Sequence, residues 1–391
     1  MEKVKEKGDR RLRVWHLLGA YAKLFYVRGR NYSCAPIEAE APYLLVSNHV
    51  TNFDPFLVGL ASLEQPISFV ASEHIFRLGF VSKLLKKLVD PIPRSKAASG
   101  AGTVKSCLRR LRAGEAVGLF AEGDCTWDGV SAPVFPATGK LAKAAGVPLV
   151  TFRIEGGHLT SPRWAKTKRK GFMYGAPVRV YSPEELKSMT PEEVTEAISR
   201  DIFEDAWEKQ RNTPVRFSGK RLAEGLERAF FVCPECGALS SLSAKGDIIR
   251  CSACGLEARL NEYGFLENCR FKTTREWDEW QKEALEKMLE TGEAKDLSKP
   301  LCGKLTRLSE EEGERQKPER AELSLDLAGR ALRINGAAVP FGDISDMSMV
   351  KTNRLLFFKE DGYFEFKCKD GALRPYLNLW QAARRLKEGK C

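Results

Sequence analysis

The chain has 391 residues, of which 43% are hydrophobic and 29% are charged, and its formal net charge is +11. At about 150 residues per domain, this length suggests two or three domains. No run of about 20 uncharged apolar residues occurs, so no membrane-spanning helix is predicted, and the N-terminus lacks the pattern of a signal peptide. We therefore expect a cytoplasmic protein whose eleven cysteines are reduced thiols.

The positive charge is concentrated in two short segments. Residues 1–30 carry nine Lys or Arg against three Asp or Glu, and residues 153–170 carry six against one. Their excesses, +6 and +5, together equal the net charge of the whole chain. Such basic patches bind polyanions, which favours nucleic acid or an anionic lipid surface as a partner.

Residues 1–30 predict a basic amphipathic N-terminal helix. Apolar side chains that include Trp15, Leu18 and Phe25 recur at helical spacing among basic residues. A helix of this kind can lie in a membrane interface with those three side chains as its apolar face. It can equally dock on the domain that follows, because core-facing helices show the same periodicity.

Residues 31–217 alternate between short apolar runs and helical patterns, which predicts an α/β domain. Its fold class is a mixed, mostly parallel sheet flanked by helices. We expect strands at 43–46, 67–71, 116–120 and 148–154, and helices after Pro55, at 79–88, 104–112 and 141–145, and from Pro191 onward.

The rest of the chain predicts three smaller regions. Residues 228–268 hold four regularly spaced cysteines, and 270–317 read as a helix followed by a charged linker. Residues 318–391 show the alternation of a β-rich domain closed by a helix at 373–386. The outline of this last region is similar to that of pleckstrin-like domains.

The sharpest chemical signal is the run SNHVTNFDP at residues 47–55, directly after a buried strand. The carboxylate of Asp54 can accept a hydrogen bond from one ring nitrogen of His49 and leave the other as a proton acceptor. Positions i and i+5 do not share a helix face, so a turn must intervene, and Pro55 favours one. Alternatively, Asp54 only caps a helix whose first residue is Pro55.

This run resembles the NHxxxxDP motif of the glycerolipid acyltransferases, the lysophosphatidate acyltransferase family. Three further blocks of that family follow in order: a strand-end arginine at Arg94, FAEGDCTWDG at 120–129, and an apolar strand opened by Val147-Pro148. Together the blocks cover roughly the first half of the chain.

The resemblance implies a mechanism without an acyl-enzyme. His49 takes the proton of an acceptor hydroxyl as it attacks the thioester of acyl-CoA or acyl-carrier protein, and Asp54 orients the imidazole. Substrate-binding roles carry over to four residues: Asn48, Arg94, Glu122 and Gly123. The implied acceptor is a lysophospholipid such as 1-acylglycerol-3-phosphate.

The acceptor block departs from the family at two positions. Asp124 and Cys125 stand where the family has threonine and arginine, and 135–139 (FPATG) lacks the usual lysines. An acidic side chain facing a phosphate is unfavourable, so phosphate selectivity is weakened at this point. Arg94 can still supply a bidentate phosphate contact.

Two CxxC pairs form the second strong signal. Cys233 and Cys236 are separated by fourteen residues from Cys251 and Cys254, and each pair is followed by glycine. This spacing predicts a zinc ribbon with four thiolate ligands. The ribbon could bind nucleic acid or protein, but the absence of a dense basic cluster favours a structural metal staple.

The sequence thus predicts a peripheral O-acyltransferase of phospholipid synthesis on the inner face of the membrane. Its expected partners are an anionic membrane surface, a lysophospholipid and acyl-carrier protein, while nucleic acid is disfavoured because no aromatic residues are interleaved with a basic groove. The alternative is a zinc-ribbon adaptor whose degenerate acyltransferase domain only binds lipid. The intact His49, Asp54 and Glu122 argue against the adaptor.

Overall fold

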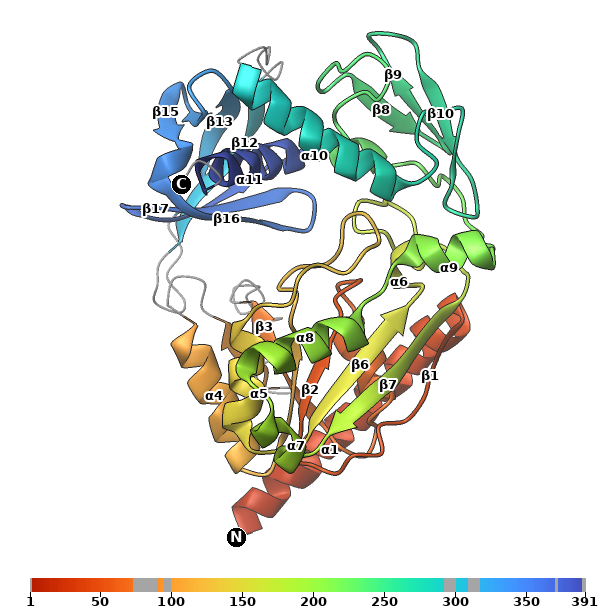
Figure 1. Ribbon diagram of the computed structural model, residues 1–391, viewed down its shortest axis with the longest axis vertical. Coiled ribbons are helices and arrows are strands. Elements are labelled where there is room, and N and C mark those ends of the chain that lie inside the picture. Colours follow the sequence, from red (N-terminus) through yellow and green to blue (C-terminus); the bar gives the residue numbers. More distant parts are fainter. Residues whose placement is uncertain are drawn as a thin grey trace. The chain divides into compact units, whose positions relative to one another are not determined.

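The computed structural model describes residues 2–72, 90–94, 100–291, 300–308, 317–369 and 372–388 (Figure 1). The chain divides into two compact units. Unit 1 comprises Met1–Pro162 and Lys168–Ser218, and unit 2 comprises Arg163–Thr167 and Gly219–Cys391. Within the described residues, no helix is long and apolar enough to cross a membrane.

Unit 1 is built on a seven-stranded sheet with the order β1-β7-β6-β2-β5-β3-β4. β6 and β7 pair antiparallel, and the other described pairs of this sheet are parallel. The strands are β1 (Tyr32–Cys34), β2 (Leu44–Ser47), β3 (Ile67–Ser72), β4 (Ile92–Arg94), β5 (Ala116–Phe120), β6 (Leu149–Glu155) and β7 (Met173–Tyr181). The predicted mostly parallel α/β fold is confirmed.

Both faces of this sheet are buried, because successive side chains of β2 enter opposite cores. Leu45 belongs to one hydrophobic cluster and Leu44 with Val46 to the other. One core is covered by α1 (Glu2–Ala22), a π-helical turn (Lys23–Arg28) and α2 (Asp54–Leu60), and the other by α4 (Ala101–Arg112), α5 (Ala137–Ala145), α7 (Pro183–Ser188) and α8 (Pro191–Ile202). The short helices α6 (Gly157–Thr160) and α9 (Ala206–Asn212) complete the unit.

Over the described residues, the strands and helices predicted for unit 1 match observed ones closely. The helix expected at 79–88 lies outside the described residues. The helix predicted from Pro191 is α8, and its start is fixed by a capping box in which Thr190 and Glu193 satisfy each other's backbone N–H groups.

The N-terminal helix has two apolar faces, and the predicted apolar face mixes them. Trp15 is buried against Gly59 of α2 and donates a hydrogen bond to Ser62 O at 2.7 Å, so it belongs to the core and not to an exposed face. A second set of large apolar side chains is 46–71% exposed: Leu17, Tyr21, Leu24 and Phe25. We call these four the exposed stripe. The helix therefore docks on its domain and still presents an apolar face.

Unit 2 begins with the cysteine module. Its four strands form an antiparallel sheet in the order β11-β10-β9-β8: β8 (Leu242–Lys245), β9 (Ile248–Cys251), β10 (Glu257–Leu260) and β11 (Leu266–Glu267). Helix α10 (Thr274–Thr291) packs on this module, where the indole of Trp277 donates a hydrogen bond to Val232 O at 3.0 Å.

The C-terminal part of unit 2 is a seven-stranded antiparallel sheet in the order β15-β14-β13-β12-β18-β17-β16, followed by α11 (Arg374–Glu388). Its strands are β12 (Leu301–Leu308), β13 (Glu319–Asp326), β14 (Ala331–Ile334), β15 (Ala337–Pro340), β16 (Ile344–Val350), β17 (Arg354–Lys359) and β18 (Gly362–Lys367). The β-rich region thus begins before residue 318. The range 270–317, predicted as a helix and a charged linker, includes β12, which pairs with both β13 and β18.

A buried ion pair joins the two helices of unit 2. Arg374 of α11 and Asp278 of α10 are 2% and 0% exposed, and their Nη1 and Oδ1 atoms lie 2.7 Å apart. Arg374 also donates a hydrogen bond to Ala229 O at 2.8 Å. Because a buried charge needs a partner, this pair fixes how α10 and α11 pack.

The basic segment at 163–170 is not a uniformly solvated loop. Trp164 is buried in unit 2 and Arg169 is buried in unit 1, whereas Lys166, Lys168 and Lys170 are exposed. Two of its side chains are therefore buried, and its three lysines are the most accessible part of the segment.

Candidate active site and metal centre

The predicted catalytic residues lie at the carboxyl edge of the parallel sheet. β2 and β5 are adjacent, and Ser47 stands opposite Phe120 at their ends. His49 and Glu122 each follow two residues later, so the sheet register alone brings them together. Ligands of open α/β sheets bind at this edge.

His49 and Asp54 form the predicted pair. Nδ1 of His49 lies 2.8 Å from Oδ2 of Asp54, and the carboxylate is fully buried while the imidazole is 20% exposed. Since the carboxylate accepts the Nδ1–H bond, Nε2 is left as the proton acceptor. This is the arrangement of a general base held by a carboxylate.

Asp54 is placed by a turn over residues 50–53 and not by helix capping. Its carboxylate accepts hydrogen bonds from the backbone N–H groups of Val50 and Thr51 at 2.7–3.0 Å and from the Thr51 hydroxyl at 2.7 Å. All of these donors precede α2, and Asp54 is itself the first residue of that helix, one position earlier than Pro55 predicts. The simple capping alternative therefore does not describe this carboxylate.

Glu122 holds the backbone on both sides of the site. Its oxygens accept hydrogen bonds from His49 N–H at 2.8 Å and from Ala132 N–H at 2.6 Å. Burial raises the pKa of Glu122 to about 7, although these two bonds oppose the rise. Its carboxylate therefore positions the loop that carries His49, and its predicted contact with substrate stays a prediction.

Asn48, which is predicted to bind substrate, fixes the backbone around the site. Its amide donates to Ile154 O and accepts from Ile154 N–H, both at 2.8 Å, and the side chain is fully buried. These two bonds clamp the end of β2 to β6. The substrate-binding role of Asn48 stays a prediction, and the structure shows its amide nitrogen and oxygen each bonded to the backbone of Ile154.

The structure brings together Arg94 and Gly123, two of the residues predicted to bind substrate. Arg94 lies over the ring of Phe135 with Cζ 5.2 Å from the ring centroid. A Cβ at Gly123 would meet Arg94 Nη1 at 3.1 Å and Phe135 at 2.3 Å, and Gly123 has φ +75°. Only glycine suits that position, both for its backbone and for its space.

Two side chains line the imidazole of His49. Phe120 stacks on it at 4.5 Å between centroids. Sγ of Cys125 lies 3.4 Å from Nε2 and 3.6 Å from Nδ1. Burial lowers the pKa of His49, but its interactions with Cys125 and Asp54 raise that pKa by more, so the net pKa lies well above the ordinary value.

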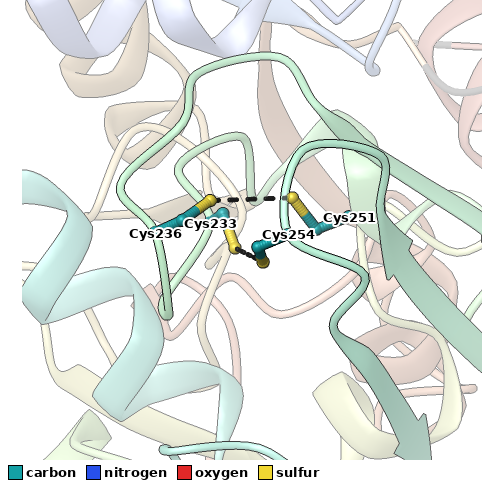
Figure 2. Close-up of side chains that lie close together, drawn as sticks. All are labelled: Cys233, Cys236, Cys251 and Cys254. Carbon is teal, nitrogen blue, oxygen red and sulfur yellow. Dashed lines mark hydrogen bonds between the residues drawn. The ribbon is translucent and has the colours of Figure 1, made fainter.

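The four predicted metal ligands converge in unit 2 (Figure 2). The Sγ atoms of Cys233 and Cys254 are 3.7 Å apart, those of Cys236 and Cys251 are 3.8 Å apart, and all four lie within 4.8 Å of one another. Sulfurs at about 2.3 Å from a tetrahedral zinc would be about 3.8 Å apart. The cluster therefore fits a metal ion of this size.

The two CxxC turns have the same backbone geometry. In the first turn, Cys233 N–H donates a hydrogen bond to Ala238 O, and Cys233 O accepts one from Gly237 N–H. In the second turn, Cys251 makes the equivalent bonds with Leu256 and Gly255, and all four distances are 3.0 Å. Gly237 and Gly255 both have positive φ, at 69° and 77°. The glycine after each pair therefore closes the turn, as the spacing predicts.

Comparison with known proteins identifies the class of the first unit. Residues 27–155 match the family model described as Acyltransferase. This part of the chain is thus an acyltransferase domain, as the resemblance of its motifs predicts.

The chain is similar to two known proteins. The 1-acyl-sn-glycerol-3-phosphate acyltransferase of Bacillus subtilis (strain 168) is 25% identical over 179 residues, which is 44% of this chain and 85% of that protein. The crystal structure of the 1-acyl-sn-glycerophosphate (LPA) acyltransferase PlsC from Thermotoga maritima matches with a TM-score of 0.42 and 16% identity, over 53% of this chain and 81% of that one.

Proposed function

We propose that this chain transfers a fatty acyl group from an acyl thioester, acyl-CoA or acyl-carrier protein, to a hydroxyl of a lysophospholipid in phospholipid synthesis. The observation that carries the proposal is the His49–Asp54 pair at 2.8 Å, at the carboxyl edge of the sheet. His49 Nε2 takes the hydroxyl proton as the oxygen attacks the acyl carbonyl, and Asp54 stabilises the imidazolium that forms.

The acceptor we propose to test first is 1-acylglycerol-3-phosphate. The relative in Bacillus subtilis carries that substrate in its name. Arg94 beside Gly123 offers a positive charge for the phosphate, whereas Asp124 opposes one. Acceptors with and without phosphate therefore belong in the same panel.

The decisive experiment combines purified protein, radiolabelled palmitoyl-CoA and this acceptor panel. His49→Ala should lower the transfer rate by roughly 10²- to 10⁴-fold, because it removes the general base. His16→Ala is the matched control, since His16 is a half-exposed histidine outside the site and should keep the wild-type rate. Wild-type transfer by a folded His49→Ala protein would refute the mechanism, and binding without transfer for every donor and acceptor would favour the adaptor.

For the membrane partner, we propose an anionic lipid surface bound by the exposed stripe. The exposed basic residues Arg13 and Arg28 flank this stripe, and Lys23 lies within it. Apolar side chains between basic ones suit an anionic interface, which also holds the lipid substrate. Inner-face membrane association is part of this proposal.

For the metal, we propose zinc held by Cys233, Cys236, Cys251 and Cys254. The sulfur spacing supports a tetrahedral ion, and an all-thiolate set suits zinc in a reducing compartment. Its role in this proposal is structural, because the four-stranded module is too small to be stabilised by its own core.

A further inference from the structure

Cys125 stands against the catalytic imidazole and is held there by the backbone around it. It lies in the loop after β5, between Glu122, which accepts His49 N–H, and Thr126, whose N–H donates to His49 O at 3.0 Å. The residue is only 5% exposed, and its Sγ lies 3.4 Å from Nε2 of His49. The loop therefore presents a thiol to the nitrogen that acts as the base.

This places three groups in the order of a catalytic triad. A nucleophile lies within reach of a base, Cys125 Sγ and His49 Nε2, and the base is oriented by the carboxylate of Asp54. That order, and not any sequence position, identifies nucleophilic catalysis. The direct transfer proposed above uses His49 and Asp54 and gives this thiol no role.

We propose that Cys125 is the nucleophile of the acyl transfer and carries the acyl group as a thioester before it passes to the acceptor. This inference rests on the proposed function, because it uses the same acyl donor and the same hydroxyl acceptor. In this mechanism, two successive displacements at the acyl carbon replace a single direct one, and His49 is the base in both.

The two steps balance without any further reactant. In the first, His49 takes the Cys125 thiol proton, the sulfur attacks the donor carbonyl, and the bond from the acyl carbon to the donor sulfur breaks. The donor thiolate then takes the proton from His49. In the second, His49 takes the acceptor hydroxyl proton, the oxygen attacks the Cys125 thioester, and the Cys125 thiolate leaves and is reprotonated by His49.

The resting geometry requires a small movement for the first proton transfer. Because Sγ is almost equally distant from Nε2 and Nδ1, it does not lie in line with the Nε2 lone pair. A rotation about the Cα–Cβ bond of Cys125 changes that direction. Nucleophile–base contacts are commonly looser before substrate binds.

The test measures partial reactions that only an acyl-enzyme supports. With palmitoyl-CoA and labelled free CoA but no acceptor, the wild-type protein should exchange label into palmitoyl-CoA. Acid quenching should leave a palmitoyl adduct on the Cys125 peptide, and added acceptor should discharge it as fast as steady-state turnover. Initial rates should follow ping-pong kinetics.

Variants assign the adduct to this sulfur. Cys125→Ala should lose the exchange, the adduct and at least roughly 10²-fold in transfer rate, the scale at which single catalytic groups act. Cys34→Ala, a half-buried thiol of the same unit, should keep all three. The exchange and adduct are read on the wild-type protein as well, so poor folding of Cys125→Ala would not hide the answer.

Two results would overturn the proposal, and they are distinguishable. Transfer to the acceptor without exchange or adduct would show direct displacement and leave the proposed function intact. Absence of transfer to every acceptor, with no exchange or adduct, would remove the acyl-enzyme and the proposed function together. Exchange with no acceptor found would support Cys125 and direct the search to other hydroxyl acceptors.

Discussion

At the scale of single residues, the site is organised by carboxylates that bind backbone N–H groups. Asp54 and Glu122 are both buried, and each accepts hydrogen bonds that fix the loop carrying His49. A buried acceptor that loses its donors costs about 1–3 kcal/mol per group. The catalytic geometry is therefore coupled to the stability of this loop.

Asp54→Asn should move the pH–rate profile as well as lower the rate. The base works when His49 is neutral, so the rate rises with pH through the pKa of His49, which is raised in the native protein. Removing the Asp54 carboxylate lets burial lower that pKa, so the acid limb should shift to lower pH. The plateau should fall by roughly 10²- to 10⁴-fold, because the ring loses its orientation.

The matched control for this pH–rate experiment is Asp205→Asn. Asp205 caps α9 by accepting from the N–H groups of Trp207 and Glu208, and asparagine caps a helix equally well. This variant should keep both the plateau and the acid limb. An unchanged acid limb in Asp54→Asn would show that His49 is not the group that titrates.

Sequence reasoning could reach the His49–Asp54 pair but not the role of Asn48. The pair is local, because five residues and one turn decide it. The Asn48 clamp depends on β6 being the neighbour of β2, with Ile154 106 residues away in the sequence. Similarly, the contact of Cys125 with His49 follows from the packing of two strand ends, and the sequence could only place it in the acceptor motif.

At the scale of helices and strands, hydrophobic periodicity predicted most of unit 1, but it could not assign the faces of α1. Trp15 and Phe25 both fit one apolar pattern, yet Trp15 packs in the core while Phe25 is 46% exposed. The π-helical turn at Lys23–Arg28 contributes to this, because it changes the angular spacing that a regular helix would keep. β12 lies within the predicted helix-and-linker range, because its pairing with β13 and β18 depends on strands later in the chain.

Replacing Leu17, Leu24 and Phe25 by serine should weaken binding to anionic vesicles by at least about 100-fold. Each large apolar side chain contributes up to about 1.5–3 kcal/mol when fully buried. Co-sedimentation with phosphatidylcholine–phosphatidylglycerol vesicles at low and high salt measures the effect. Deleting residues 1–30 would be ambiguous, since Trp15 and Tyr26 belong to the core.

Val178 and Val180 provide the control for the vesicle experiment. They are exposed apolar side chains of β7, away from the helix in the sequence, so replacing both by serine should leave vesicle binding unchanged. Equal losses in the two sets of variants, or no loss in the first, would contradict a membrane role for the exposed stripe.

Gly139→Ala should destabilise unit 1 by about 1–3 kcal/mol through overpacking. A Cβ at Gly139 of α5 would lie 2.1 Å from Pro191 O and 2.3 Å from Thr195 Oγ1, both in α8. Gly102→Ala in α4 meets no atom within 4 Å and should be neutral or stabilising by up to about 1 kcal/mol. Urea denaturation of both variants measures the difference, and equal midpoints would contradict this close packing.

At the scale of the whole molecule, the two units illustrate what a local pattern can specify. In unit 1, the predicted catalytic residues come from separate loops and meet only because parallel strands end at one edge. In unit 2, each CxxC pair fixes its own turn, so the spacing alone identified all four cysteines of the cluster. The sequence therefore predicted the cysteine cluster completely and the candidate active site only in its local part.

Removing the metal should loosen the cysteine module of unit 2 while leaving the chemistry of unit 1. Thiolate sites make metal binding part of the folding free energy, so chelation should raise hydrogen exchange over residues 231–256 and lower their resistance to protease. Cys236→Ser should do the same, whereas Cys269→Ser, a cysteine outside the cluster, should not.

Freshly purified, reduced protein should contain one zinc per chain by elemental analysis. Its His49-dependent transfer rate should stay within about twofold after chelation, because general base catalysis depends on the groups around His49. A metal-free protein with a fully protected module would refute the zinc site, and loss of transfer on chelation would show that the metal serves the active site as well.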